Sequence, residues 1–434
     1  MRDLLLTAIV FGSLPFILFW RPHLGALLWV WISMMNPHRL SYGFAYNFPF
    51  AQVIAITTLV GLLFTRHRRP FPLTPVSGLL LAFLAWMSFT ALFALQPADV
   101  VFDVWWRVVK TQIMLLATLM LIRGRAQIDQ LIWTIVISVG FYGVKGGVWT
   151  ILRGGVHTVW GPPGSYIEGN NELALALVML LPLMYYLAHT GSKRWLRYGL
   201  WAAMGACTFS ILGSQSRGAL LALGTLVVLL GTKSNRPILV TAVLLAGLAC
   251  AVAFMPDHWS ARMNTIEAFE QDASAMGRIQ TWQTIWNMVL HRPVVGAGFD
   301  LASPLLFQLY APVPDLQVLG PHSIYFQALG EHGFVGLGLY LALGLVIWRR
   351  ARMLALLAAG QPDLEWLPIL MRMVQVSLLG FAVGGAFLGL LHYDLPYYLA
   401  AIVVLAEAEM RERRAMAPSP KMKDVTTSQE TQRV

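Results

Sequence analysis

Long apolar runs dominate this chain and constrain its fold more than any other feature. A helix needs roughly 17–25 mostly apolar residues to cross a bilayer. Twelve runs are of about this length: 4–20, 48–65, 77–94, 104–122, 128–151, 170–189, 195–212, 216–231, 236–255, 323–348, 369–391 and 395–410. They predict an all-α polytopic membrane protein with about 12 transmembrane helices.

A shorter run at 23–35 leaves the side of the N-terminus open. It has 13 residues and follows Pro22, which suits a re-entrant or interfacial segment as well as a span. Twelve spans place both termini in the cytoplasm, and counting 23–35 as a span moves the N-terminus outside. The first run has no convincing cleavage site after it, so we interpret it as an anchor.

Charged residues are scarce and lie mostly between the apolar runs. They make up 12% of the 434 residues, against roughly 25% in a soluble domain, so most of the chain must face lipid. The net charge of +10 arises largely from basic clusters in every second loop, and such loops stay in the cytoplasm. No basic stripe with stacking aromatics accompanies them, which argues against nucleic-acid binding.

The loops near 95–103, 152–169, 213–216, 256–322 and 391–394 are then periplasmic. This divides the chain into a transmembrane region at 1–255, a large periplasmic loop domain at 256–322, C-terminal transmembrane helices at 323–410 and a polar cytoplasmic tail at 411–434. The tail is expected to be disordered. The loop domain should contain an amphipathic helix near 275–290, whose apolar face carries Ile279, Trp282, Trp286 and Val289.

Two arginines stand where membrane topology and helix electrostatics both disfavour a cation. Arg217 begins a span at its periplasmic end, and Arg278 lies near the start of the amphipathic helix. The helix macrodipole opposes positive charge at such positions, so neither arginine helps its own helix. A helix N-terminus with an arginine is a site for an anion, and pyrophosphate is the obvious candidate. A salt bridge to Glu168, Glu172 or another loop carboxylate is the alternative.

Three further cations lie inside predicted spans near the periplasmic side, namely Arg107, Lys110 and Lys145. Cations in such positions are costly and indicate function by default. They are therefore candidates for contacting the same anion. Pairing of Arg107 with Asp103, four residues before it, and snorkelling of the lysines to the interface remain the alternatives.

His322 lies at the periplasmic start of another span. A helix N-terminus disfavours imidazolium, so this histidine should be neutral and able to accept a proton, as a general base must. Glu331 and His332 lie about two turns deeper, in a supporting polar role or in helix packing. No acidic pair or histidine cluster in a periplasmic loop suggests a divalent ion, so no metal ligands and no cofactor are predicted.

Three segments resemble the O-antigen ligase family, the membrane enzymes that join O-antigen to lipid A–core. They are Ser214-Gln215-Ser216-Arg217-Gly218-Ala219-Leu220; Gly277-Arg278 through Trp282 to Pro293-Val294-Val295-Gly296-Ala297-Gly298; and Pro321-His322-Ser323-Ile324-Tyr325 through Glu331-His332-Gly333-Phe334-Val335-Gly336. The resemblance covers roughly residues 160–400. Asn often follows the histidine in the family, and Ser323 stands there in this chain. The N-terminal stretch Asn36-Pro37-His38-Arg39 resembles O-glycosylation ligases associated with exosortase systems.

The resemblance implies a metal-independent, inverting glycosyltransferase with a GT-C-like fold in the bacterial inner membrane, its active site facing the periplasm. The donor would be a glycan linked to undecaprenyl pyrophosphate, and the acceptor a sugar hydroxyl of lipid A–core. Arg217 and Arg278 would hold the pyrophosphate, and His322 would activate the acceptor. Substrate contacts would come from Arg107, Lys110, Lys145, Gln215, Ser216 and Tyr325.

Other functions remain open. An O-antigen polymerase or a protein O-oligosaccharyltransferase of the same superfamily shares these motifs, and only the acceptor separates them from a ligase. A transporter of lipids or glycans is the alternative from another class. Interrupted helices with charges at the bilayer centre would favour it, whereas the unusual charges here gather at one face.

Overall fold

The computed structural model describes residues 1–66, 68–232, 237–257, 259, 273–314 and 316–416. Within these ranges the chain is 77% helical and has no strand, which confirms the all-α prediction. The helices are α1 Arg2–Phe19, α2 His23–Met35, α3 Phe50–Phe64, α4 Pro75–Ala91, α5 Ala98–Leu121, α6 Gly124–Leu152, α7 Asn170–Thr190, α8 Arg194–Gly213, α9 Arg217–Thr232, α10 Pro237–Ala253, α12 Ala273–His291, α13 Pro304–Tyr310, α14 Ile324–Ala358, α15 Trp366–Gly384 and α16 Asp394–Met416.

Each predicted apolar run falls on a helix of its own, and the doubtful run at 23–35 is the helix α2. Six helical segments of the described chain are both long and apolar enough to cross a membrane: Arg2–Phe19, Ala98–Leu121, Gly124–Leu152, Asn170–Thr190, Ile324–Ala358 and Pro362–Phe387. Five shorter apolar helices accompany them, including α2, α3 and α4. The number of spans therefore stays a prediction, as does the side on which each loop lies.

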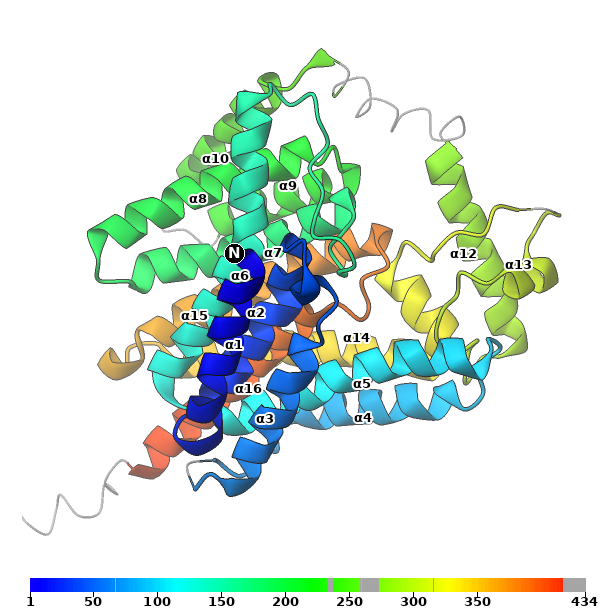
Figure 1. Ribbon diagram of the computed structural model, residues 1–434. Coiled ribbons are helices and arrows are strands. Elements are labelled where there is room, and N and C mark those ends of the chain that lie inside the picture. Colours follow the sequence, from blue (N-terminus) through cyan, green and yellow to red (C-terminus); the bar gives the residue numbers. More distant parts are fainter. Residues whose placement is uncertain (67, 233–236, 258, 260–272, 315, 417–434) are drawn as a thin grey trace, which may run out of the picture.

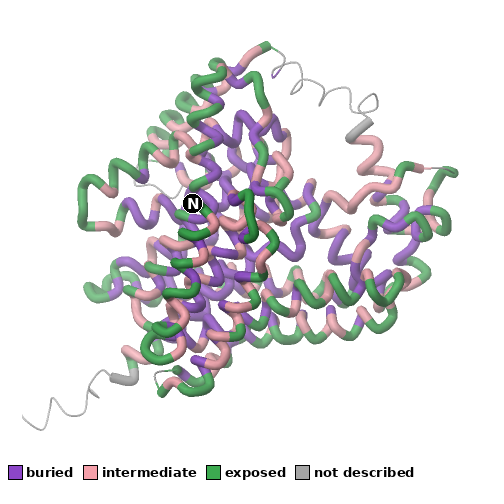
Figure 2. The backbone as a smooth tube through the Cα atoms, viewed as in Figure 1, coloured by how far each residue is buried: buried purple, intermediate pink, exposed green. Residues whose placement is uncertain are grey.

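α7 forms the centre of the molecule. It packs against α6, α8, α9 and α15, and 83% of its most apolar stretch is buried, against 17% for α1. A helix that is apolar on every side lies either in a protein core or in a membrane, and the burial of α7 places it among other helices. Figure 2 shows the buried positions concentrated in the middle of the molecule and the exposed ones on the outer helices. Figure 1 shows α4, α5 and α14 extending from this centre towards α12 and α13.

The loop domain contains the predicted amphipathic helix as α12, and its buried face agrees with the predicted one only in part. Ile285, Met288 and Val289 are fully buried in a small core that they share with residues of α13 and α14. Trp286, placed on the apolar face from the sequence, is 46% exposed. The prediction was partly wrong because Thr281 and Thr284 are buried although they are polar, while Trp286 contacts the Phe334 ring of α14 and still keeps much of its surface exposed.

The C-terminal boundary also differs from the prediction. α16 continues through the basic cluster to Met416, so the tail expected to begin at residue 411 is helical at its start. Arg413 donates to Glu409 one turn earlier at 2.9 Å, and such a pair stabilises a helix end. The remainder of the predicted tail lies outside the described residues.

α14 is broken at Gly333. This residue has φ 69° and ψ −172°, a region that only glycine adopts without strain. A Cβ at this position would collide with the carbonyl oxygens of Val294 and Pro293. The break lies near the first end of α14, so the continuous helix that follows it still has the length of a span.

The segment 293–298 supplies the hydrogen bonds that the break removes from the helix. Backbone groups inside a membrane protein must all be satisfied, so a broken helix is stable only with substitute partners. Three bonds join the segment to α14: Ala297 N to Gly330 O at 2.8 Å, Gly298 N to Glu331 O at 3.0 Å and Phe334 N to Pro293 O at 2.8 Å. A fourth comes from α4, where Trp86 Nε1 donates to His332 O at 2.9 Å. Residues of the second and third family motifs are thereby joined through their backbones.

We expect Gly333→Ala to destabilise the protein by about 1–3 kcal/mol, because the substitution forces a strained backbone conformation. Gly338→Ala is the matched control in the same helix, since a Cβ there meets no atom within 4 Å. Thermal unfolding of the purified protein in detergent should show a lower Tm for Gly333→Ala and an unchanged or raised Tm for Gly338→Ala. Equal Tm values for the two variants would contradict the break.

Candidate functional site

The starts of α7 and α9 are held together by a side chain. Asn170 is the first residue of α7, and its Nδ2 donates to the Ser214 carbonyl at 2.7 Å. This bond ties the start of α7 to the turn that leads into α9. Arg217, the first residue of α9, therefore lies beside the start of α7.

The turn before Arg217 is built by its own side chains. Gln215 has a φ of 57°, and the Ser214 Oγ accepts from the Ser216 amide at 3.3 Å. The Ser216 Oγ accepts from the Ala219 amide at 3.2 Å and so caps α9. Gln215 and Ser216 are both buried. Gln215 and Ser216, which the sequence predicted as substrate contacts, thus form the turn that positions Arg217.

The connection after α15 lies between the start of α9 and the start of α14. A Cβ on Gly218 would lie 3.5 Å from the Phe387 Cβ, and one on Gly385 would lie 2.7 Å from the Ile324 Cδ1. Further along the connection, a Cβ on Gly389 would lie 3.7 Å from the His322 amide nitrogen. One short segment, residues 385–389, therefore borders His322 and the start of α9, where Arg217 lies.

α12 is fixed against the residues just before α14. The Trp282 Nε1 donates to the Pro321 carbonyl at 2.7 Å, and its ring stacks on Phe326 with centroids 5.0 Å apart and planes 2° apart. Arg278 is one helical turn before Trp282. Because α12 begins at Ala273, Arg278 lies in the second turn of the helix.

Arg278 and His322 act on each other electrostatically. Burial lowers the pKa of the half-buried His322, and the Arg278 guanidinium lowers it further. His322 has a φ of 41°, a strained conformation of the kind that accumulates at functional sites. The Arg278 charge also acts on Glu172 near the start of α7, the carboxylate that the sequence offered as its alternative partner. Guanidinium, imidazole and carboxylate are thus gathered from three helix starts.

The remaining predicted contacts are distributed differently. The Arg107 guanidinium lies near enough to act electrostatically on Tyr166, in the loop that leads into α7, which brings it close to this region. Lys110 is exposed, with its Nζ 5.7 Å from the Trp106 ring centroid, and Lys145 is exposed on α6. The anion-facing role of the two lysines stays a prediction.

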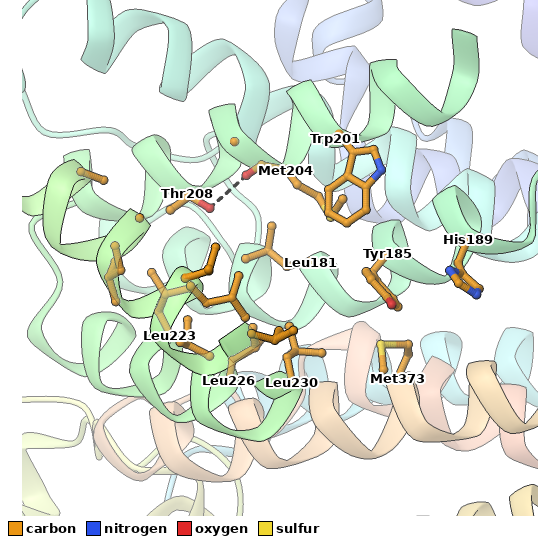
Figure 3. Close-up of a pocket in the computed structure, with 18 of the residues that line it drawn as sticks. Leu181, Tyr185, His189, Trp201, Met204, Thr208, Leu223, Leu226, Leu230 and Met373 are labelled. Carbon is orange, nitrogen blue, oxygen red and sulfur yellow. Dashed lines mark hydrogen bonds between the residues drawn. The ribbon is translucent and has the colours of Figure 1, made fainter. Parts of the chain in front are cut away.

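Tyr325 faces the helix bundle. Its hydroxyl donates to the Ala382 carbonyl in α15 at 2.8 Å, so it fastens α14 to α15. Its ring lines an apolar cavity of about 430 Å³ between α14, α15 and α16, together with Tyr340 and Tyr397. A larger apolar cavity of about 790 Å³ lies between α7, α8, α9, α10 and α15 (Figure 3), with Tyr185, His189 and Trp201 at one end.

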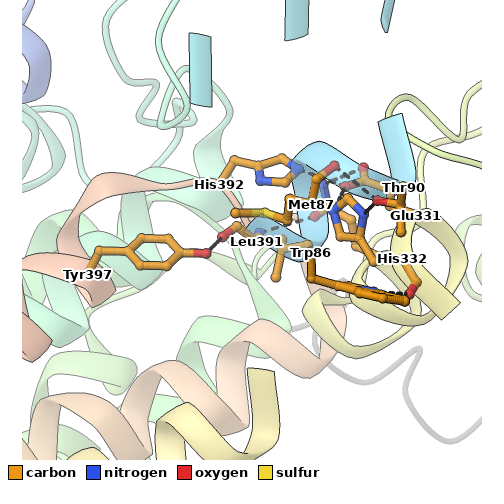
Figure 4. Close-up of polar contacts among 9 residues, drawn as sticks. Trp86, Met87, Thr90, Glu331, His332, Leu391, His392 and Tyr397 are labelled. Carbon is orange, nitrogen blue, oxygen red and sulfur yellow. Dashed lines mark hydrogen bonds and ion pairs between the residues drawn. The ribbon is translucent and has the colours of Figure 1, made fainter. Parts of the chain in front are cut away.

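A buried polar network that the sequence did not predict lies two to three turns below the start of α14 (Figure 4). Glu331 Oε2 is 2.7 Å from His392 Nε2 and 3.5 Å from His332 Nε2, and Gln327 Nε2 donates to Glu331 Oε1 at 3.0 Å. His332 Nδ1 is 2.8 Å from the Thr90 hydroxyl. The sequence drew attention to Glu331 and His332, but His392 stands in a distant loop and gave no signal.

Comparison with known proteins divides the chain into two regions. Residues 1–192 match a family of unknown function (DUF5935), so the resemblance of the N-terminal stretch to O-glycosylation ligases stays a prediction. Residues 202–341 match the O-Antigen ligase family. No curated protein matches the chain.

The second match extends from α8 into α14 and contains Arg217, Arg278, His322 and Glu331. It therefore contains all three predicted catalytic residues, and the helix starts that bear them converge in the structure. The apolar helices and this match together describe a multi-pass membrane protein. The chain carries an O-antigen ligase family domain at residues 202–341, and this region contains the three motifs that resembled that family.

Proposed function

We propose that this protein is a glycosyltransferase that transfers a glycan from undecaprenyl pyrophosphate to a sugar hydroxyl of lipid A–core, at the periplasmic face of the bacterial inner membrane. The observation that carries the proposal is the interaction of Arg278 with His322 at adjoining helix starts. The start of α9, which bears Arg217, borders the same segment 385–389 that borders His322. A guanidinium beside a neutral imidazole suits an anionic leaving group and a hydroxyl nucleophile.

The proposed reaction is a single displacement. His322 accepts the proton of the acceptor hydroxyl, and the oxygen forms a bond to the anomeric carbon while the bond from that carbon to the pyrophosphate breaks. Undecaprenyl pyrophosphate leaves with the bonding electrons, and Arg217 and Arg278 stabilise its growing charge. One displacement inverts the anomeric configuration. The step needs no divalent ion, because the two guanidiniums supply the positive charge.

The lipid tail of the donor needs an apolar path next to these residues. The cavity beside Tyr325 begins at Ile324, two residues after His322. It is lined almost entirely by apolar side chains of α14, α15 and α16. We assign it to the first isoprene units, with the pyrophosphate at the helix starts above. The fold is then of the GT-C kind, with a lipid donor entering from the side.

We expect Arg217→Ala and Arg278→Ala to reduce transfer about 10²–10³-fold through the loss of charge stabilisation. His322→Ala should reduce it by about 10²–10⁴-fold through the loss of the base. The measurement is the joined product formed by purified, reconstituted protein at equal expression. Arg153→Ala and His291→Ala are matched controls, since Arg153 stacks on Trp149 and His291 is exposed at the end of α12. Full activity of His322→Ala would exclude it as the base.

The pH dependence follows from the environment of His322. Burial and Arg278 both disfavour the imidazolium, so the pKa lies below its usual 6.5. The base acts only when neutral, so kcat/KM should stay high at neutral pH and fall on acidification with a midpoint below 6.5. An acidic limb centred above pH 6.5 would contradict this assignment.

The acceptor separates the proposal from its relatives. Reconstituted protein with a lipid-linked glycan should modify lipid A–core in preference to the glycan repeat or a protein, at a rate that added Mg²⁺ or Mn²⁺ does not change. Elongation of the repeat would identify a polymerase, and a glycosylated protein an oligosaccharyltransferase. Movement of the lipid across vesicles without any joined product would favour a transporter, which the break in α14 at Gly333 and the buried Glu331 beside it would suit.

A further inference from the structure

Three buried metal-binding side chains meet beneath the proposed site. Glu331 and His332 end the first part of α14, and His392 belongs to the loop before α16. Their side chains are almost completely shielded from solvent, and the nearest ligand atom of each lies within 4.8 Å of the others. Figure 4 shows the two imidazoles and the carboxylate converging on one another.

Hydrogen bonds fix the form of His332. The Thr90 hydroxyl donates its one proton to the Met87 carbonyl at 3.0 Å. Its oxygen is therefore the acceptor for His332 Nδ1 at 2.8 Å, which places the ring proton on Nδ1 and a lone pair on Nε2. That nitrogen is buried, has no hydrogen-bond partner among the described residues, and is 3.5 Å from the Glu331 Oε2.

The orientation of Glu331 is fixed in the same way. Gln327 Oε1 accepts from the Leu391 amide at 3.1 Å, so its Nε2 must donate to Glu331 Oε1 at 3.0 Å. Glu331 Oε2 is left facing the His332 lone pair. The same oxygen is 2.7 Å from His392 Nε2, so two imidazole nitrogens and one carboxylate oxygen meet in a buried interior. A positive species among them, either a cation or a shared proton, makes this arrangement favourable.

We propose that this species is a single transition-metal ion of the zinc class, bound by Glu331 Oε2, His332 Nε2 and His392 Nε2. Two imidazoles and one carboxylate form a common zinc ligand set, with a water in the fourth position. Metal-bound histidines donate their second ring proton to a neighbouring oxygen, and ligating carboxylates accept an outer hydrogen bond. Thr90 and Gln327 supply these bonds, while His392 Nδ1 has no such partner among the described residues.

The ion has a structural role. His322 precedes the start of α14, and seven residues of helix at 1.5 Å each separate Ile324 from Glu331, about 10 Å along the axis, so the ion does not touch the reacting atoms. It joins the break in α14 to the loop that carries His392. This loop continues directly from segment 385–389, which borders His322. The ion therefore holds this loop, and with it one wall of the site, against α14. The inference does not depend on the proposed transfer reaction.

The test is the metal content of the full-length protein, purified in detergent without a polyhistidine tag and measured by inductively coupled plasma mass spectrometry. We expect about one zinc per chain in the wild type, retained in His291→Asn and lost in His392→Asn and Glu331→Gln. Stripping the metal with a chelator should lower the Tm, and Zn²⁺ but not Mg²⁺ should restore it.

Variants that fail to fold leave a measurement on the wild type. Co²⁺ taken up by the stripped wild-type protein should give the visible absorption bands of a four-coordinate site, and one equivalent of Zn²⁺ should remove them. Wild-type protein that purifies without stoichiometric transition metal, and takes up neither Zn²⁺ nor Co²⁺, would overturn the proposal and leave a proton as the species between Glu331 and His332. Neither outcome bears on whether the glycan is transferred.

Discussion

The backbone groups released at the break in α14 are the constraint on which this region depends. A helix interrupted in an apolar interior must find other partners for its amides and carbonyls. Segment 293–298 provides them with two left-handed glycines, Gly296, which lies directly against the backbone of α14, and Gly298, which lies against Ala94. The motifs in α12, in this segment and in α14 therefore form one structural unit, although thirty to sixty residues separate their ends.

This unit and the start of α9 carry positive charge near helix N-termini, where the helix dipole opposes it. Arg217 and Arg278 lie near the starts of their helices, and His322 is strained and half-buried beside the Arg278 charge. Such positions reduce stability, and a protein retains them when they serve a ligand. Glu172 offsets part of the positive charge from the start of α7, so the cluster can exist before an anionic substrate arrives.

The sequence predicted the helices well because length and apolarity alone define them, and every predicted run is a helix. It identified the site through residues that contradict their local surroundings, Arg217 and Arg278 above all. It could not reveal His392, whose partner Glu331 is 61 residues away, nor the break at Gly333, which becomes visible only through the segment that packs on it. The buried face of α12 was misjudged for a similar reason, since packing against α14 decides which residues are covered.

The central position of α7 has a consequence for the two family regions of the chain. The first match ends at residue 192, just after α7, and the second begins at 202, within α8. Yet α7 packs against α8, α9 and α15, so the boundary between the matches cuts through one shared interior. The largest core contains residues of both regions. Substitutions in α7 must therefore be compatible with the helices on both sides of the boundary.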